Sequence, residues 1–195
     1  MRILHVTSGL GVGGAERALY NLLAGGLAER FESRVIALRN DGHFADRIRE
    51  LGVEVEVLDA CLRDPRWMVR LFRIARRFRP DLVQAWMYHG NLAASLAAAV
   101  QPGHVPVVWN VRHSLNGIAR ERPGMRAVIR LNRLLSGRPQ AIIYNSVVSR
   151  QLHEDLGFAP ARGQTIPNGF DLERWRFNPQ VRRQVRSELN LDPQA

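Results

Sequence analysis

Short apolar segments alternate with amphipathic segments along most of the chain. The apolar segments are rich in Val, Ile and Leu, which predicts β-strands. They cover residues 2–7, 34–38, 53–58, 82–86, 105–111, 141–144 and 164–166. Between them, apolar residues recur every three or four positions, which predicts helices with one buried face. We expect these helices at residues 15–27, 44–51, 65–78, 91–100, 123–135, 147–156 and 182–189.

The alternation of strands and helices predicts the fold class. Strands separated by helices of about 10 to 15 residues are typical of right-handed βαβ units, which build a parallel sheet. We therefore expect an α/β, Rossmann-like fold with helices on both faces of a parallel sheet. Segment 53–58 alternates apolar residues with Glu, so that strand should have one wet face near a sheet edge. Ligands of such sheets bind at the carboxyl ends of the strands.

The composition fits one compact domain with an unusual charge. Hydrophobic residues make up 46% of the 195 residues, which is enough for a sizeable core. All 28 basic residues are Arg, and the net charge is +10. This charge favours anionic partners such as nucleic acid, phosphate-bearing small molecules or an acidic membrane surface. Cys61 is the single cysteine, which excludes an internal disulfide framework and offers no cluster for a structural zinc.

No segment predicts secretion or insertion into a membrane. Residues 1–6 lead directly into the first strand without a charged and then apolar signal peptide. No apolar run approaches the roughly 20 residues that span a bilayer. We therefore expect a cytoplasmic protein that is soluble or peripheral to a membrane.

A glycine-rich segment follows the first strand. Residues 9–14 read Gly-Leu-Gly-Val-Gly-Gly and fit the G-x-G-x-x-G pattern of dinucleotide sites. Glycines let the backbone approach a diphosphate, and the next helix offers its N-terminal N–H groups. A site for NAD also needs an acidic residue about 20 positions later, whereas Arg39 ends the second strand and suits the 2′-phosphate of NADP. The segment is thus a phosphate site, an NADP site, or a tight turn that packs helix against strand.

Four short motifs follow one another along the chain. They are Gly-Gly-Ala-Glu at 13–16, Pro-Asp at 80–81 with His89 after the strand, a strand at 107–113 ending in Arg-His, and Ile-Pro-Asn-Gly-Phe-Asp at 166–171. In this order and spacing they resemble the N-terminal half of family-4 retaining glycosyltransferases of the GT-B fold. The resemblance covers almost the whole chain, and the first and last motifs are specific in combination.

The resemblance implies an enzyme of two Rossmann-like domains that face each other across a cleft. Residues 1–175 would form the N-terminal, acceptor-binding domain. Residues 176–195 would be a linker or the start of a missing C-terminal domain that binds the nucleotide-sugar. The implied reaction is the retaining transfer of a sugar from a UDP- or GDP-sugar to a carbohydrate or lipid-linked acceptor, in bacterial polysaccharide or glycolipid synthesis. It implies no metal and no cofactor, because the nucleotide-sugar is a co-substrate.

The resemblance also implies a role for each motif. His89 would be the catalytic residue at the cleft, where it orients the reacting groups while the leaving phosphate takes the proton of the acceptor. Trp86 and Met87 stand where relatives often carry polar residues, which suggests an apolar acceptor pocket. The other implied roles are donor-diphosphate contacts for Gly13 and Gly14, acceptor binding for Arg112, His113 and Glu16, and an interdomain segment of Asn168, Gly169 and Asp171.

Each of these residues also has an ordinary structural interpretation. His89 at a strand end can be a hydrogen-bonded polar residue without a catalytic role. Glu16 can simply favour the positive end of a helix. Asn168 and Gly169 form a turn signal in any protein.

The arginine-rich stretches leave the partners open. The stretch 66–79 is expected to be a solvated helix face, whereas 112–133 flanks the implied acceptor side and could dock on an anionic membrane at the inner leaflet. The basic segments lack a groove-reading motif or a base-stacking platform, so we expect no nucleic acid partner. Two alternatives for the whole chain remain: an NADP-binding oxidoreductase domain, and a basic module that binds membranes or polyanions.

Overall fold

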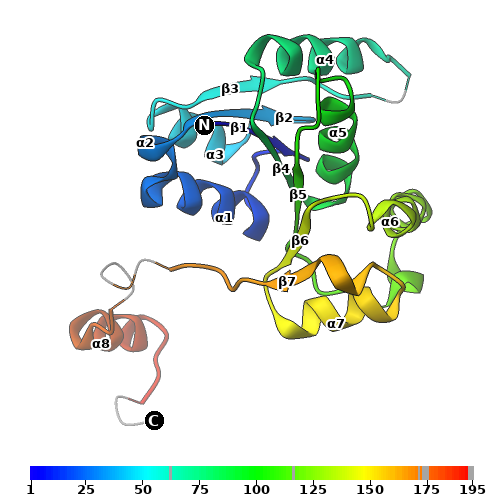
Figure 1. Ribbon diagram of the computed structural model, residues 1–195. Helices are drawn as coiled ribbons and strands as arrows, with labels where there is room; N and C mark the ends of the chain where they lie inside the picture. The colour runs from blue at the N-terminus through cyan, green and yellow to red at the C-terminus, as the bar shows by residue number, and fades with distance from the viewer. Residues whose placement is uncertain (62, 116, 171, 173–175, 193–195) are drawn as a thin grey trace.

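The computed structural model describes residues 1–61, 63–115, 117–170, 172 and 176–192. Its centre is a seven-stranded sheet in the order β3-β2-β1-β4-β5-β6-β7, in which each neighbouring pair is parallel (Figure 1). The strands are β1 (Arg2–Thr7), β2 (Glu32–Ala37), β3 (Glu54–Val57), β4 (Leu82–Trp86), β5 (Val107–Val111), β6 (Ala141–Tyr144) and β7 (Gly163–Thr165). The predicted parallel α/β fold is confirmed, and the strand with alternating glutamates lies at the sheet edge as expected.

Helices connect the strands and cover both faces of the sheet. They are α1 (Gly14–Leu22), α2 (Ala28–Arg30), α3 (His43–Arg49), α4 (Arg66–Phe78), α5 (Met87–Ala99), α6 (Pro123–Leu135), α7 (Val147–Asp155) and α8 (Pro179–Glu188). Short 3-10 turns occur at Ile118–Arg120 and Pro160–Arg162. Figure 1 shows α1 and α3 on one side of strands β1 to β3 and α4 on the other side.

Two hydrophobic clusters fill the spaces between the sheet and its helices. Successive residues of a strand point to opposite faces, so β2 contributes to both clusters. Val35 packs in the cluster that holds the buried residues of α1 and α3. Ile36 packs in the larger cluster, which holds the buried residues of α4 and α5. The sheet is therefore buried on both faces, which is the usual state of a parallel sheet.

The helix predicted at residues 15–27 is interrupted. α1 ends at Leu22, a wider π-type turn covers Leu23–Leu27, and α2 begins at Ala28. Inside this turn Gly26 has φ +102°, a left-handed conformation that glycine adopts without strain. The apolar spacing predicted a continuous helix because Leu23 is still buried, but two consecutive glycines favour a break.

α5 begins earlier than the sequence pattern indicates. It starts at Met87, directly after β4, instead of at residue 91. Its first turn lies against β1, since a Cβ on Gly90 would be 2.7 Å from the carbonyl oxygen of Val6. Only glycine allows so close an approach, and the approach places His89 at the start of a helix instead of in a loop.

The C-terminal helix α8 also begins earlier than its prediction at residues 182–189. The side-chain oxygen of Asn178 accepts the backbone N–H groups of Gln180 and Val181, and Pro179 occupies the first helical position. An Asn cap followed by Pro is a strong signal for a helix start. Figure 1 shows α8 apart from the sheet, and its side chains are not buried.

Candidate functional site

The parallel strands β1, β4 and β5 have their carboxyl ends on the same side of the sheet, which we call the carboxyl edge. From β1 the chain continues to β2 on one side, and it returns later to β4 on the other side of β1. Loops that diverge in this way leave a crevice at the carboxyl ends of the strands. The fold therefore brings Gly13 after β1, His89 after β4 and Arg112 after β5 to one edge, although they are far apart in the sequence.

The glycine-rich loop packs against the segment that follows β2. The backbone N–H of Phe44 donates to the carbonyl oxygen of Leu10 at 2.9 Å. A Cβ on Gly9 would lie 2.5 Å from Oδ1 of Asn40. By contrast, a Cβ on Gly14 would meet nothing within 4 Å. A side chain at Gly9 would thus displace the exposed Asn40 side chain, whereas the described residues give no packing reason for Gly14.

Helix α1 begins without a side-chain cap. Gly13 is its N-cap residue, has extended backbone angles and offers no side-chain oxygen. The carboxylate of Glu16, in the first turn, lies back against Gly13, where an added Cβ would overlap it. A carboxylate in this place favours the positive end of the helix. This contact agrees with the ordinary interpretation of Glu16.

His89 lies in the first turn of α5 and is half-buried. Burial lowers the pKa of its imidazole, and the positive charge of Arg39 lowers it further. Among the described residues, its side chain makes no hydrogen bond. Met87, two residues earlier, has φ +64°, which is uncommon for a residue with a side chain and is often found at functional sites. The result is a neutral imidazole at the strand end with free hydrogen-bonding capacity.

Arg112 is half-buried and held from two sides. Its guanidinium Nη1 donates to Oδ1 of Asn168, and its Cζ lies 5.5 Å from the centre of the Trp86 ring. Burial lowers its pKa. Its Nε is buried and has no hydrogen-bond partner in the described parts of the chain. Trp86 is 1% exposed, and its ring packs against the Arg112 guanidinium. Trp86 therefore has almost no exposed apolar surface that could line a pocket.

His113 begins a chain of hydrogen bonds that runs into the protein. Its Nδ1 is 3.4 Å from Oη of Tyr88, and Tyr88 Oη is 2.6 Å from Nε2 of His153. Nδ1 of His153 is 2.6 Å from the carbonyl oxygen of Ser149, so this nitrogen carries the proton. Nε2 of His153 therefore accepts a hydrogen bond from the hydroxyl of Tyr88. On the outer side, Nε2 of His113 is 3.8 Å from a carboxylate oxygen of Glu121.

Tyr88, Ser149 and His153 were not identified from the sequence. Burial raises the pKa of Tyr88 and lowers that of His153, so both are neutral hydrogen-bonding groups near pH 7. Ser149 also donates through Oγ to the carbonyl oxygen of His113 at 2.8 Å. Tyr88 stands next to a motif residue, but no local spacing relates it to His153 on α7.

The segment after β7 returns to the same edge of the sheet. The carbonyl oxygen of Gly169 accepts a hydrogen bond from Nδ2 of Asn21 on α1 at 3.4 Å. Together with the contact of Asn168 to Arg112, this bond places the segment beside both α1 and β5. Asp171, the third predicted residue of this segment, lies outside the described residues.

The described residues contain no group of three or more His, Cys, Asp and Glu side chains that could hold a metal ion. No helix formed by them has the length and apolar character to cross a membrane.

Comparison with known proteins relates the chain to one enzyme family. The family model described as Glycosyltransferase Family 4 matches residues 12–174. No curated protein sequence matches the chain.

Solved structures share the fold at low sequence identity. A structure of Anabaena Alr3699/HepE in complex with UDP and glucose has a TM-score of 0.77 and 21% identity, covering 97% of this chain and 50% of that chain. The apo form of the lipopolysaccharide outer core galactosyltransferase WaaB has a TM-score of 0.62 and 11% identity, covering 88% and 47%. UDP-GlcNAc 2-epimerase from Neisseria meningitidis, bound to UDP-GlcNAc, has a TM-score of 0.55 and 17% identity, covering 96% and 53%. The chain thus spans about half the length of these proteins.

Proposed function

The chain belongs to glycosyltransferase family 4, and we propose that it is the acceptor-binding half of an enzyme that transfers a sugar from a nucleotide-sugar. The observation that carries this proposal is the family match over residues 12–174, which includes the loop at Gly13, His89, and Arg112. These residues come from three separate strand ends of one parallel sheet, the edge where such folds bind ligands.

The donor in this proposal is a UDP- or GDP-sugar whose diphosphate lies beside Gly13 and Gly14. Gly14 has open space around its Cα, and α1 begins there with no side-chain cap. Backbone N–H groups at a helix start stabilise the charge that develops on a leaving diphosphate. The UDP in the HepE structure and the UDP-GlcNAc in the Neisseria meningitidis structure support a donor of this class.

We propose that His89 orients the acceptor hydroxyl against the donor sugar. Its pKa is lowered by burial, so the imidazole is neutral near pH 7 and can donate or accept a hydrogen bond. In a reaction that retains configuration, the leaving phosphate takes the proton of the hydroxyl. His89 then contributes by positioning, and no metal or further cofactor is needed.

Arg112, His113 and Glu16 are the proposed acceptor contacts. Arg112 is a half-buried cation, which suits an acidic or phosphate-linked acceptor. His113 is oriented through Tyr88, whose hydroxyl is itself fixed by His153. Arg112 also holds Asn168, so we assign Asn168, Gly169 and Asp171 to the connection between two domains.

The domain limits are part of the proposal. Residues 1–175 form the first domain, and 176–195 form the linker or the start of the donor-binding domain. α8 supports this division because Val181 and Val185, with Leu189 directly after the helix, are spaced four residues apart and have exposed fractions of 52%, 43% and 62%. An apolar stripe at this spacing is typical of a helix that packs against another element.

We further propose a cytoplasmic location with peripheral contact to the inner face of an anionic membrane. On α6, Arg130 and Arg133 are exposed, and the half-buried Arg126 lies one turn before Arg130. Leu131 and Leu134 of the same helix have exposed fractions of 45% and 72%. Arginines beside exposed leucines fit a surface of anionic lipid. Binding to phosphatidylglycerol vesicles that is lost in R130Q/R133Q tests this contact.

The alternatives have less support. An NADP-binding oxidoreductase domain rests on the glycine loop and on Arg39, but the family match includes Gly13 and Gly14 of that loop together with three further motifs. A basic module that binds membranes or polyanions accounts for the charge alone. The glycosyltransferase proposal explains the four motifs without either alternative and without a nucleic acid partner.

Titration of the complete two-domain protein with UDP, GDP and NADP tests the proposed function. Binding of UDP or GDP supports the transferase and identifies the base of the donor. Binding of NADP alone rejects it in favour of the oxidoreductase. The isolated 195-residue chain is expected to have no transferase activity, because it spans about half of its structural relatives.

A further inference from the structure

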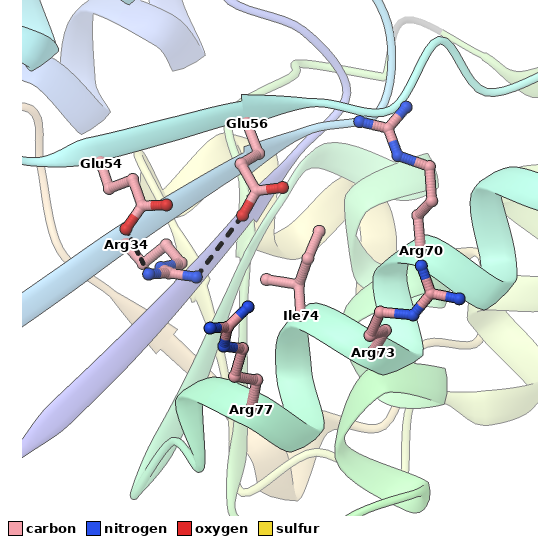
Figure 2. Close-up of a pocket in the computed structure, with 7 residues that line it drawn as sticks. All are labelled: Arg34, Glu54, Glu56, Arg70, Arg73, Ile74 and Arg77. Atoms are coloured by element: carbon pink, nitrogen blue, oxygen red, sulfur yellow. Dashed lines mark hydrogen bonds and ion pairs between the residues drawn. The ribbon is translucent and has the colours of Figure 1, made fainter.

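A charged pocket lies away from the carboxyl edge, between β3 and α4 (Figure 2). It has a volume of about 410 Å³. Its strand side is lined by Arg34, Glu54 and Glu56, and its helix side by Arg70, Arg73, Ile74 and Arg77. None of these residues belongs to the motifs that meet at the proposed catalytic site.

The sequence builds this pocket from two simple spacings. Arg34 pairs in register with Glu54, and Glu56 is two positions further on the same strand face. On α4, Arg70, Arg73 and Arg77 are three and four positions apart, which places them on one side of the helix. Ile74 between them is 8% exposed and fixes that side of the helix against the sheet.

The acidic residues of the pocket are already paired. The guanidinium of Arg34 contacts Glu54 and lies 3.4 Å from Oε1 of Glu56. Its Cζ lies 5.2 Å from the centre of the Phe78 ring, so this arginine is held on three sides. Both carboxylates therefore pair with one fixed cation, and no described acidic side chain forms an ion pair with the helix arginines Arg70, Arg73 and Arg77.

The helix arginines have unused binding capacity. Arg70 donates through Nη2 to the carbonyl oxygen of Val57 at 3.2 Å, which does not neutralise its charge. Within the described parts of the chain, Arg73 and Arg77 make no hydrogen bond or ion pair. Figure 2 shows the guanidinium of Arg77 on the side of Arg34, whereas the guanidinium of Arg70 points towards β3 and away from that of Arg73.

We propose that this pocket binds the phosphate group of a ligand, with Arg73 and Arg77 as the principal contacts. Guanidinium groups match phosphate oxygens with paired hydrogen bonds, and four guanidiniums against two carboxylates leave two positive charges in the pocket. A metal ion is disfavoured because both carboxylates are occupied by Arg34. An apolar ligand is disfavoured because Ile74 is the sole apolar residue among the lining residues.

The proposed phosphate site is independent of sugar transfer. Arg34 lies in the first half of β2 and Glu54 is the first residue of β3, whereas the catalytic candidates follow the ends of their strands. A phosphate bound here does not compete with the donor. The phosphate group belongs either to a free molecule or to a lipid headgroup, and the two are separated by experiment.

Calorimetric titration of the chain with inorganic pyrophosphate tests the site. R73Q/R77Q removes the two unpaired cations and should weaken binding by at least about tenfold, since a hydrogen bond to a charged group contributes about 1.5–3 kcal/mol. The matched control R76Q/R79Q removes the same charge from two exposed arginines at the end of the same helix, outside the pocket, and should change affinity by less than about threefold. Circular dichroism checks that each variant is folded.

A third variant acts in the opposite direction. Glu56→Gln releases one side of the Arg34 guanidinium and adds one positive charge to the pocket. Pyrophosphate should then bind about threefold more tightly, a change within the range of an exposed ion pair. Weaker or unchanged binding contradicts the assigned role of the pocket.

Vesicles that contain phosphatidic acid distinguish the two sources of phosphate. Pyrophosphate binding that depends on Arg73 and Arg77 supports the site with a free ligand. Vesicle binding with the same dependence, in the absence of pyrophosphate binding, supports it with a lipid headgroup. Failure of both probes, or equal losses in R73Q/R77Q and R76Q/R79Q, overturns the proposal and indicates attraction by overall charge.

Discussion

Arginines at the carboxyl edge and arginines on α4 carry the same charge but are held differently. Arg112 is half-buried between the Trp86 ring and the side chain of Asn168. Arg73 and Arg77 are exposed and bind no other group in the described residues. A cation with fixed partners can direct one chemical group to one place, whereas exposed cations that bind no other described group remain available to an incoming anion.

The two regions also differ in what a substitution should cost. Removing a partner from a buried polar cluster leaves other buried groups without hydrogen bonds, which costs about 1–3 kcal/mol. Removing an exposed charge usually costs less than about 1 kcal/mol of folding stability. Substitutions at the carboxyl edge should therefore change catalysis or folding. Substitution of the exposed arginines Arg73 and Arg77 on α4 should change the binding of an anion and have little effect on folding stability.

The largest expected effect is at His89. In the complete two-domain enzyme, His89→Ala should lower kcat by about 100-fold, because the reacting groups lose a positioning contact at the strand end. The free energy of unfolding should change little, since His89 makes no hydrogen bond within the described chain. His104→Ala, at an exposed histidine away from this edge, is the control. A His89→Ala enzyme with normal kcat would remove His89 from the catalytic site.

The next effect concerns folding beneath the carboxyl edge. His5 on β1 is fully buried, both ring nitrogens lack hydrogen-bond partners in the described residues, and burial lowers its pKa to about 3. The unfolded chain, with an ordinary His pKa of 6.5, binds more protons between these two values. The free energy of unfolding should therefore fall as the pH is lowered from 6.5 toward 3, by up to ~1.4 kcal/mol per pH unit.

Denaturant titrations at several pH values measure this slope. His5→Met removes the titrating group, so its stability should depend less on pH than that of the wild type in the same window. Identical slopes for the two proteins would show that His5 is not buried in its neutral form.

A smaller effect is expected at Arg112. Arg112→Lys keeps the charge but loses the planar fork that reaches Asn168, so kcat/KM should fall by about tenfold. Arg120→Lys, at an exposed arginine of the same segment, should leave kcat/KM unchanged. If Arg112 and Asn168 act as a pair, Asn168→Ala should add little to the Arg112→Lys variant. Losses that simply add would separate the two residues.

The smallest effect distinguishes two glycines of one loop. Gly9→Ala should lower stability by less than about 1 kcal/mol, because its Cβ would lie 2.5 Å from Oδ1 of Asn40 and that exposed side chain must move aside. Gly14→Ala should leave stability nearly unchanged, since a Cβ there meets nothing within 4 Å. If Gly14 lies beside the donor, the same change should weaken UDP-sugar binding by a few-fold. Thermal unfolding and calorimetry measure the two effects separately.

Local patterns were sufficient to predict most of the fold. Each strand carries its own apolar run, so the parallel sheet and the wet edge strand followed from segments such as 53–58. Interruptions were harder to predict, because the break at Gly26 leaves the apolar spacing unchanged. The early start of α5 depends on the contact of Gly90 with β1, which no local pattern contains.

The candidate site was predictable only in part. Resemblance identified the motifs, and the sheet order brings three of them to one edge. The contact between Tyr88 and His153 joins residues 65 positions apart, so periodicity could not reveal it. The pocket at α4 was not predictable for the same reason. The glutamates of β3 and the arginines of α4 are evident in the sequence, but the pocket between them depends on how the helix packs against the strands.

The thiol of Cys61 provides a site for labelling the protein beside the arginine pocket. It is exposed, it is the sole cysteine of the chain, and it lies in the connection between β3 and α4, the two elements that enclose the arginine pocket. A maleimide fluorophore would therefore attach at one known position without prior mutagenesis. Because the chain also contains no lysine, amine-reactive dyes would label only its N-terminus. Two different dyes could then be placed selectively, and the distance between them followed by energy transfer as an anion is added.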